Sequence, residues 1–241
     1  MRSLCLVSLG LAASLGAADI CGAIRSLVAA EAKKQDIPAI SVAAVQKHQV
    51  ICSVALGWAD LEQRVPNTDR SRHRLASLSK PVTAVLTMRF AEEGRIGLDE
   101  SVRNVLPELP SAYAPVTVRH LLSHQSGIRE YLGMAEVFST QHYTNLSEAA
   151  RAIFLGSPLL FKPGLQTAYT TYGYTLLGAA LERVTGQSFR EILESRLHRF
   201  GLDDSLALRR ERVRPYRKLA SRGWENTPPF DASNKYPGGG A

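Results

Sequence analysis

A serine and a lysine three positions apart, Ser77 and Lys80 in the run Ser-Leu-Ser-Lys, are the residues of this sequence that could do covalent chemistry together. Pro81 follows them, and proline fits a helix only in its first turn, because it has no backbone N–H. Pro81 therefore predicts that a helix begins close to Ser77. Residues three apart share a helix face, so Lys80 can reach the Ser77 hydroxyl.

The beginning of a helix is a useful place for such a pair. Unpaired backbone N–H groups and the helix dipole favour negative charge there. A lysine held by a buried helix loses solvent, which makes its neutral form more accessible. A neutral Lys80 could then accept the Ser77 proton and activate the serine as a nucleophile. The spacing alone fits equally well with a helix-capping serine and a surface lysine, and both interpretations stay open at this point.

The helix that positions this pair is predicted over residues 77–93. Gly94 is expected to end it. Its apolar side chains fall in two stripes, so we expect the helix to be buried on most sides. These stripes are Val82, Val85, Leu86 and Phe90, and Ala84, Met88 and Ala91.

The surrounding segments predict both helices and strands. Apolar residues at helical spacing indicate a helix over 21–34. Two β-prone runs, 40–45 and 50–56, indicate an antiparallel hairpin. Segment 60–74 is polar and loop-like. Further helices are expected near 100–105, 116–122 and 146–155, and over 172–184 and 188–199, the last two closed by Gly186 and Gly201.

Composition and the N-terminus limit the class of protein. In the 241 residues 45% are apolar and 21% charged, which allows a sizeable core and excludes a disordered chain. Residues 1–18 have the features of an export signal: Arg2, an apolar run, and small residues before Asp19. The run is shorter than the ~20 residues of a spanning helix. We therefore expect no stable membrane span and a secreted or periplasmic mature protein.

Cysteines, charge and histidines suggest few partners beyond a substrate. Cys21 and Cys52 would remain after the signal, either as a disulfide or as two buried thiols. The net charge is +7, with much of the excess in the run 209–218. We interpret this run as a solvated loop and expect no nucleic-acid partner, because export separates the protein from nucleic acid. His120 and His124 are four apart, but the glutamate of a His-Glu-x-x-His site is absent, so we predict no zinc and no cofactor.

Longer stretches carry a family resemblance. Residues 74–81, Arg-Leu-Ala-Ser-Leu-Ser-Lys-Pro, resemble the first motif of the serine β-lactamase and penicillin-binding protein superfamily. Residues 121–128, Leu-Leu-Ser-His-Gln-Ser-Gly-Ile, resemble a further family segment. The sequence is most similar to class C β-lactamases, related esterases, D-alanyl-D-alanine carboxypeptidases and the mitochondrial serine β-lactamase-like members. The resemblance covers nearly everything after residue 18. It implies an α+β fold of the β-lactamase/transpeptidase type, with an antiparallel sheet flanked by helices and a mostly helical subdomain.

The family's second motif, Tyr-x-Asn, has two candidates in this sequence. Tyr143 begins a literal match, Tyr-Thr-Asn, but it lies in a polar stretch without the family's flanking residues. Tyr169 begins Tyr-Thr-Thr, with Thr171 in place of asparagine. It follows Phe-Lys-Pro-Gly at 161–164 and precedes Tyr-Gly-Tyr at 172–174, as in the family, so we choose Tyr169. Thr171 is also predicted to be the N-cap of the next helix.

The resemblance implies roles for these residues. Tyr169 would relay a proton between Ser77, Lys80 and the leaving group, and Thr171 would bind substrate. Thr171 lacks the paired donor and acceptor of an amide, so recognition of a substrate amide is in doubt. The mitochondrial-type members of the family look similar at this position, and this resemblance favours a peptide or ester substrate over an antibiotic. The implied function is a serine hydrolase that acts through an acyl-enzyme on amide, ester or β-lactam carbonyls of a small molecule or peptide. The alternatives are a non-catalytic penicillin-recognising or scaffold protein, and an inactive fragment of the enzyme.

The family's third motif, Lys-Thr-Gly or His-Thr-Gly, does not occur in these 241 residues. We therefore expect a truncated chain that lacks the C-terminal strands of the sheet. Its expected parts are an N-terminal helix, hairpin and nucleophile helix (19–95), a mostly helical subdomain (96–225) and a truncated return segment (226–241). Alone, it should be marginally stable and poorly active. The sequence leaves the oligomeric state open.

Overall fold

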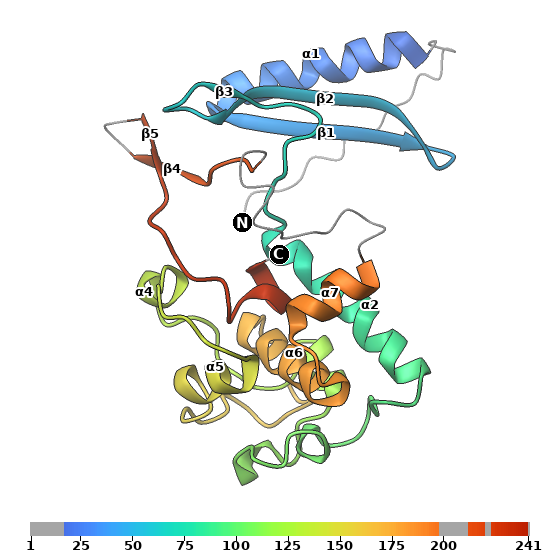
Figure 1. Cartoon of the computed structure of the whole chain (residues 1–241), viewed down its shortest axis with the longest axis vertical. Coiled ribbons are helices and arrows are strands. Elements are labelled where there is room, and N and C mark those ends of the chain that lie inside the picture. The colour runs from blue at the N-terminus through green and yellow to red at the C-terminus, as the bar shows by residue number, and fades with distance from the viewer. Residues whose placement is uncertain (1–16, 198–211, 220–222, 241) are drawn as a thin grey trace. The chain divides into compact units, whose positions relative to one another are not determined.

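The computed structural model describes residues 17–197, 212–219 and 223–240 (Figure 1). These residues form two compact units: 17–73 with 212–227, and 74–197 with 228–240. This division differs from the predicted one, because the helix that carries Lys80 belongs to the second unit. The predicted signal peptide lies almost wholly outside the described residues, as does Gly201.

The first unit is built on a helix and a hairpin. The helix α1 (Ala17–Gln35) is followed by the antiparallel strands β1 (Ala39–Gln46) and β2 (Gln49–Asp60). A two-residue strand, β3 (Val65–Pro66), pairs with the end of β2. The predicted helix and hairpin are therefore confirmed, and each is longer than expected. The small core between α1 and the hairpin contains Val28, Cys52 and Val54.

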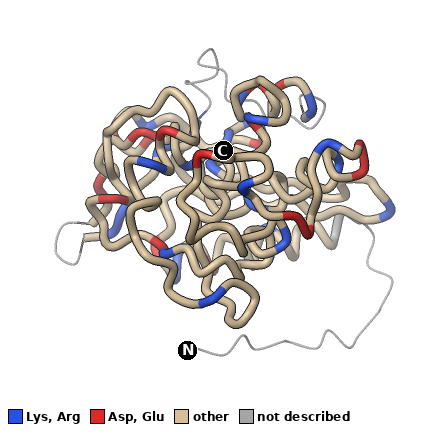
Figure 2. The backbone as a smooth tube through the Cα atoms, turned by 90° about the horizontal axis from the view of Figure 1, so that it is seen from below, with Lys and Arg blue, Asp and Glu red and all other residues tan. Residues whose placement is uncertain are grey.

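The basic run is partly a strand rather than a loop. Its described residues include β4 (Tyr216–Leu219), which pairs antiparallel with β5 (Gly223–Asn226). Acidic side chains lie next to this run: Arg214, which precedes β4, lies 2.9 Å from Asp60, and Lys218 of β4 lies 3.1 Å from Asp36. Figure 2 shows basic and acidic residues interspersed along the described backbone. Residues 209–211 of the run lie outside the described part.

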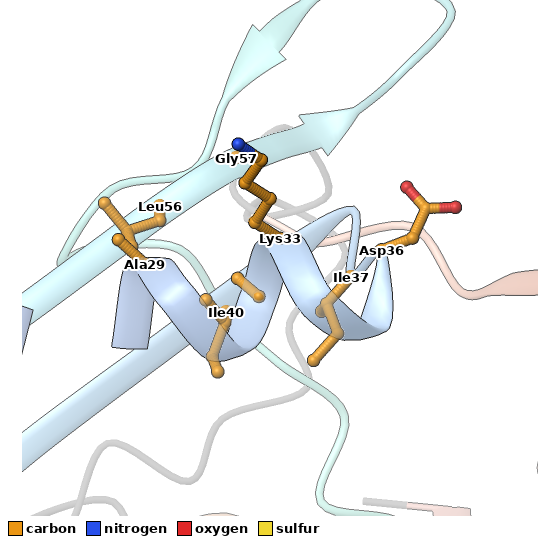
Figure 3. Close-up of a pocket in the computed structure, with 8 residues that line it drawn as sticks. Ala29, Lys33, Asp36, Ile37, Ile40, Leu56 and Gly57 are labelled. Atoms are coloured by element: carbon orange, nitrogen blue, oxygen red, sulfur yellow. The ribbon is translucent and has the colours of Figure 1, made fainter. Parts of the chain in front are cut away.

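A pocket of about 320 Å³ lies between α1 and the hairpin (Figure 3). Apolar side chains such as Ile37, Ile40 and Leu56 line it, together with Lys33 and Asp36. None of the residues that sequence analysis selected as a candidate site belongs to this lining.

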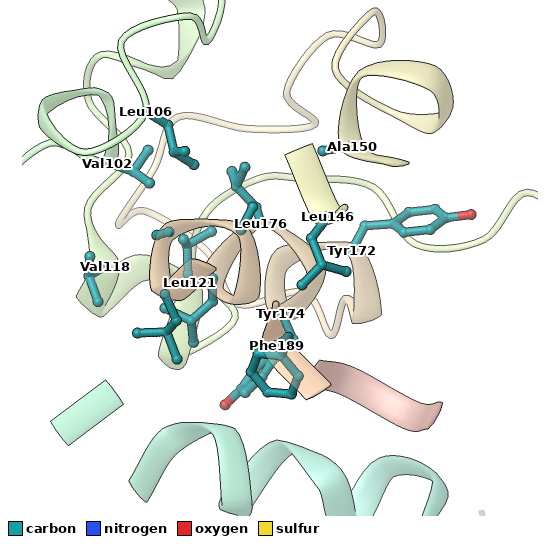
Figure 4. Close-up of a cluster of buried hydrophobic side chains, with 14 of the residues drawn as sticks. Val102, Leu106, Val118, Leu121, Leu146, Ala150, Tyr172, Tyr174, Leu176 and Phe189 are labelled. Carbon is teal, nitrogen blue, oxygen red and sulfur yellow. The ribbon is translucent and has the colours of Figure 1, made fainter. Parts of the chain in front are cut away.

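The second unit packs its helices around α6 (Thr171–Thr185). Every residue of α6 from Thr171 to Leu181 is buried, so this helix forms the centre of the core (Figure 4). Gly186 ends it in the left-handed conformation, as predicted. The other helices are α2 (Ser79–Glu92), α3 (Val118–Leu122), α4 (Met134–Val137), α5 (Leu146–Ile153) and α7 (Phe189–Leu197). The helix expected near 100–105 is a short 3₁₀ turn, Val102–Asn104.

The expectation that α2 is buried on most sides is wrong. Val85 is 58% exposed and Met88 is 43% exposed. Part of the buried face of α2 consists of threonine side chains rather than apolar ones. The Thr83 hydroxyl donates to the carbonyl of Pro237 at 2.7 Å, and the Thr87 hydroxyl donates to the carbonyl of Thr83 at 2.8 Å. Hydroxyls satisfied in this way can be buried in place of apolar side chains.

Helices and antiparallel strands together give the α+β class that the sequence predicts. No helix within the described residues is both long enough and apolar enough to cross a membrane.

The two alternatives for the cysteines are decided by the structure, in which Cys21 of α1 and Cys52 of β2 form a disulfide. The two cysteines are 31 residues apart.

Because the link restricts the unfolded chain, reducing the disulfide should lower the free energy of unfolding of the first unit by about 3–4 kcal/mol. Urea unfolding with and without reductant measures this difference. A double Cys21→Ser, Cys52→Ser variant should unfold like the reduced protein and should not respond to reductant. Labelling of Cys21 or Cys52 by a thiol-reactive dye in the native, unreduced protein would contradict the prediction.

Candidate active site

Ser77 and Lys80 lie at the junction of two helical segments. Ser77 is exposed in the 3₁₀ turn Ala76–Leu78, and α2 begins at Ser79 with Pro81 in its first turn, as predicted. Ala76 has a left-handed φ of 48° immediately before Ser77. Ser79 stabilises this turn by donating to the carbonyl of Ala76 at 2.7 Å. The local backbone therefore presents Ser77 outward, whereas Lys80 points into the unit and is only 4% exposed.

The hydroxyl of Tyr169 donates to Ser77 Oγ at 2.7 Å. Tyr169 lies in the loop before α6 and is 53% exposed, so the two oxygens meet at the surface of the unit. Lys80 Nζ lies 4.5 Å from the centroid of the Tyr169 ring. The structure therefore brings together the serine, lysine and tyrosine that the sequence selected.

The contacts of Lys80 differ from the expected direct bond to the serine. Its Nζ donates to Thr171 Oγ1 at 3.3 Å and to the carbonyl of Gly238 at 2.5 Å. It also lies over the rings of Tyr169 and Tyr174, the second at 5.6 Å from the centroid. A hydroxyl, a carbonyl and two aromatic faces thus surround the ammonium, each with negative charge density toward it. Ser77 and Lys80 are linked through Tyr169.

Thr171 is not the N-cap of α6, as sequence analysis expected. Thr170 is the cap: its Oγ1 accepts from the N–H of Gly173 at 3.2 Å and donates to the carbonyl of Arg129 at 2.8 Å. The cap falls one residue earlier because Thr170 has an extended backbone, and Thr171 is the first helical residue. The Thr171 hydroxyl is thereby left to accept from Lys80.

A segment that sequence analysis did not assign to the site supplies a main-chain contact. In the C-terminal segment, residues 228–240, the last described residues (236–240) contact α2 and α6, and Gly238 provides the carbonyl for Lys80. A Cβ at position 238 would lie 2.9 Å from Thr171 Cγ2 and 3.1 Å from the Thr171 carbonyl. Glycine is therefore required for this approach. The run of glycines at 238–240 is the available signal, but from the sequence alone it indicates only a turn or loop.

Two further residues next to Thr171 were also missed. The Glu130 carboxylate accepts from the N–H of Thr171, at the N-terminus of α6, where the helix dipole favours negative charge. Tyr131 packs edge-on against Tyr172 with ring centroids 4.8 Å apart, and burial raises the pKa of Tyr131. Both come directly after the segment that resembles the family at 121–128, which was their only sequence signal.

The other candidates of the sequence lie elsewhere. Tyr143 donates its N–H to Ser233 Oγ at 3.0 Å, and burial raises the pKa of its phenol. His120 forms a capping box with Thr117 at the beginning of α3. Within the described residues, no group of three or more His, Cys, Asp or Glu side chains could hold a metal ion.

His124 lies against the tyrosine rings rather than in a metal site. Its ring centroid is 4.6 Å from that of Tyr169 and 5.2 Å from that of Tyr174. Its φ of 58° is left-handed, a conformation that costs a residue other than glycine roughly 1–2 kcal/mol. Burial and the charge of Lys80 lower the pKa of this histidine.

The arrangement of oxygens and the ammonium can move a proton. The Ser77 and Tyr169 oxygens are close enough for direct transfer between them. The positive charge of Lys80 beside the phenol ring stabilises negative charge that develops on the phenol oxygen. The Ser77 oxygen is thus in contact with a phenol hydroxyl, and a cation lies beside the ring of that phenol.

Comparison with known proteins gives a family match over most of the chain. The family model described as Beta-lactamase matches residues 24–241. The serine beta-lactamase-like protein LACTB of human mitochondria is 27% identical over 276 residues, which cover 84% of this chain and 50% of that protein. Protein flp of Staphylococcus aureus is 26% identical over 174 residues, which cover 70% of this chain and 34% of flp. The chain thus spans about half the length of LACTB and about a third of flp.

Solved structures show the same fold. EstCE1, described as a hydrolase with promiscuous acyltransferase activity, superposes with a TM-score of 0.75 and 25% identity. The match covers 93% of this chain and 70% of EstCE1. The expected β-lactamase/transpeptidase-like fold is confirmed.

Substitution of two helical glycines tests whether the C-terminal segment packs against α6. An alanine Cβ at Gly178 of α6 would meet the ring of Pro237, and would lie 2.7 Å from Leu146 Cδ1. A Cβ at Gly22 of α1 would meet nothing within 4 Å. Helix propensity alone favours alanine at both positions by about 1 kcal/mol. We expect Gly22→Ala to stabilise its unit by about that amount and Gly178→Ala to destabilise by about 1–3 kcal/mol through overpacking.

Urea unfolding of the two variants measures both effects. Equal stabilisation by Gly22→Ala and Gly178→Ala would mean that residues 236–240 do not lie against α6.

Proposed function

Because this chain belongs to the β-lactamase family, within the serine β-lactamase and penicillin-binding protein superfamily, we propose that it is the catalytic part of a serine hydrolase that acts through an acyl-enzyme. The observation that carries the proposal is the 2.7 Å contact between the Tyr169 hydroxyl and Ser77 Oγ, with the buried Lys80 4.5 Å from the phenol ring. Its proposed nucleophile is Ser77.

In the proposed reaction, Ser77 Oγ attacks a carbonyl carbon. The new C–O bond forms as the carbonyl π electrons move to oxygen, and the Ser77 proton passes to the phenol oxygen of Tyr169. Tyr169 accepts that proton in its phenolate form, which arises when the phenol first releases its own proton to solvent and which the nearby Lys80 ammonium stabilises. When the tetrahedral intermediate collapses, the bond to the leaving group breaks and Tyr169 returns the proton to it. Water later releases the acyl group by the reverse proton path.

This route assigns Lys80 a different part from the one expected from spacing. The hydrogen-bond geometry supports Tyr169 as the group that exchanges a proton with Ser77, and Lys80 as the charge that supports Tyr169. The N–H of Ser77 is proposed to bind the carbonyl oxygen in the intermediate, as the family resemblance implies. One such donor typically contributes ~2.7–4 kcal/mol to transition-state stabilisation.

A peptide or ester substrate is proposed over an antibiotic. The side chain of Thr171 offers one hydroxyl, which already accepts from Lys80, so it has less capacity than an asparagine amide to bind a substrate amide. The similarity to EstCE1, a hydrolase with promiscuous acyltransferase activity, is in keeping with an acyl-enzyme in this fold.

Export is also part of the proposal. The disulfide between Cys21 and Cys52 supports an oxidising compartment, because such bonds are rare in the cytosol. Together with the features of residues 1–18, it favours a secreted or periplasmic protein.

A fluorophosphonate probe tests the nucleophile. Ser77 should displace fluoride from phosphorus and gain the mass of the phosphonyl group, and Ser77→Ala should gain none. Intact mass spectrometry with peptide mapping measures the modification. A folded wild-type chain that stays unlabelled at Ser77 would instead support the non-catalytic scaffold or the inactive fragment.

Two matched variants test whether Tyr169, rather than Tyr143, is the tyrosine that exchanges a proton with Ser77. Tyr169→Phe removes the phenol oxygen next to Ser77 and should slow labelling by roughly 10²–10⁴-fold, the usual contribution of a general base. Tyr143→Phe removes the oxygen of the rival motif and should label at the wild-type rate. Time courses of labelling for both variants measure the difference, and the assignment is wrong if Tyr143→Phe is the slower of the two.

A further inference from the structure

His124 ends α3 in a conformation that usually belongs to glycine. Its N–H donates to the carbonyl of Leu121 at 3.4 Å and the N–H of Gln125 donates to that of His120 at 2.8 Å, the two bonds of a Schellman helix end. The residue at this place has φ of 58°. A histidine held in this strained region needs contacts that a glycine could not make.

Those contacts surround Tyr169. The carbonyl of His124 accepts from the N–H of Ala168 at 2.9 Å, and its Nδ1 accepts from the N–H of Thr170 at 3.2 Å. The imidazole also stacks on the Tyr169 ring at 4.6 Å between centroids. One residue thus binds the backbone on both sides of Tyr169 and contacts its ring.

We propose that His124 is a positioning residue that holds the Tyr169 phenol against Ser77, and that it does so only as a neutral imidazole. The proposal rests on the function proposed above for Ser77 and Tyr169. It gives His124, which contacts no reacting atom, a role through the geometry of the tyrosine loop.

The protonation state follows from the hydrogen bond. Because Nδ1 accepts from Thr170, the ring proton is on Nε2 and the imidazole is neutral. The groups that face the ring are Lys80 from α2, Tyr169 from the loop and Tyr174 from α6. Burial, and then the charge of Lys80, lower the pKa of His124, and together they outweigh a smaller effect of the Thr170 backbone that raises it, so the neutral form extends into mildly acidic solution.

Acidification should break this arrangement. A proton on Nδ1 turns the acceptor into a donor that opposes the N–H of Thr170, and it places a second cation near Lys80. The loop that carries Tyr169 then loses one of its two backbone anchors, and the tyrosine oxygen moves from Ser77.

Two substitutions separate the contacts of His124. Asparagine tolerates the left-handed conformation and offers a carbonyl oxygen near the place of Nδ1, but it has no ring and does not titrate. Glycine removes the side chain and relieves the backbone strain. His120→Asn is the matched control, because His120 lies on the same helix and caps its other end.

The rate of fluorophosphonate labelling at Ser77 should fall by roughly 10–100-fold in His124→Gly, since misplacing a catalytic group by about 1 Å costs this much. His124→Asn should lose less. Between about pH 8 and about pH 5, the rate of His124→Asn relative to wild type should rise, because only the wild type loses its acceptor. The ratio for His120→Asn should stay constant. Thermal unfolding checks that each variant is folded.

Identical pH dependence of wild type and His124→Asn, or a wild-type rate in folded His124→Gly, would overturn the proposal. Amide hydrogen exchange at Thr170, followed by NMR, gives a readout without catalysis. Protection corrected for intrinsic exchange should be high in wild type at neutral pH, and low in His124→Gly and in acidified wild type. If Ser77 is never labelled in wild type, the proposed function fails, and the exchange data alone decide whether His124 anchors the loop.

Discussion

A lysine ammonium removed from water is the constraint on which the second unit depends. Lys80 is 4% exposed, and a buried cation costs several kcal/mol unless polar groups replace its hydration. Those groups come from parts of the chain that are far apart: the Thr171 hydroxyl at the beginning of α6, and the Gly238 carbonyl of the C-terminal segment. The aromatic faces of Tyr169 and Tyr174 complete the surroundings. The same contacts place a positive charge beside the Tyr169 phenol, which contacts Ser77. The groups that stabilise the buried Lys80 ammonium therefore also create the geometry on which the proposed chemistry depends.

The C-terminal segment is fixed by side-chain hydroxyls rather than by a ladder of backbone bonds. Thr83 of α2 donates to the carbonyl of Pro237, and Thr175 of α6 donates to that of Asn234 at 2.8 Å. These two helices thereby anchor a stretch without regular strands, and the missing Cβ of Gly178 makes room for it. The threonines of α2 and α6 thus connect the hydrophobic core to the site, because they bury a helix face and also set the position of the carbonyl that binds Lys80.

Sequence reasoning found the parts of the site that have a local signature. Pro81 located the beginning of α2, and the residues that flank Tyr169 distinguished it from Tyr143. Other parts of the site depend on tertiary contacts that have no local signature in the sequence. Apolar periodicity predicted an α2 buried on most sides, but hydroxyls of Thr83 and Thr87 form part of its buried face. Gly238 could not be assigned, because its role depends on a carbonyl oriented by packing, and no side-chain type signals that. The cap of α6 lies one residue earlier than predicted because threonines at 170 and 171 are equivalent by propensity, and tertiary contacts separate them: Thr170 donates to the carbonyl of Arg129, whereas Thr171 accepts from Lys80.

The distance along the chain between Lys80 and Gly238, 158 residues, has a consequence for biosynthesis. During translation, α2 and its lysine leave the ribosome long before the carbonyl that receives the ammonium has been made. Until residue 238 emerges, Lys80 has no such partner and is best left hydrated, so the interior of this unit cannot close around it. The proposed site around Ser77 and Lys80 therefore takes its final form only after residue 238 has been synthesised.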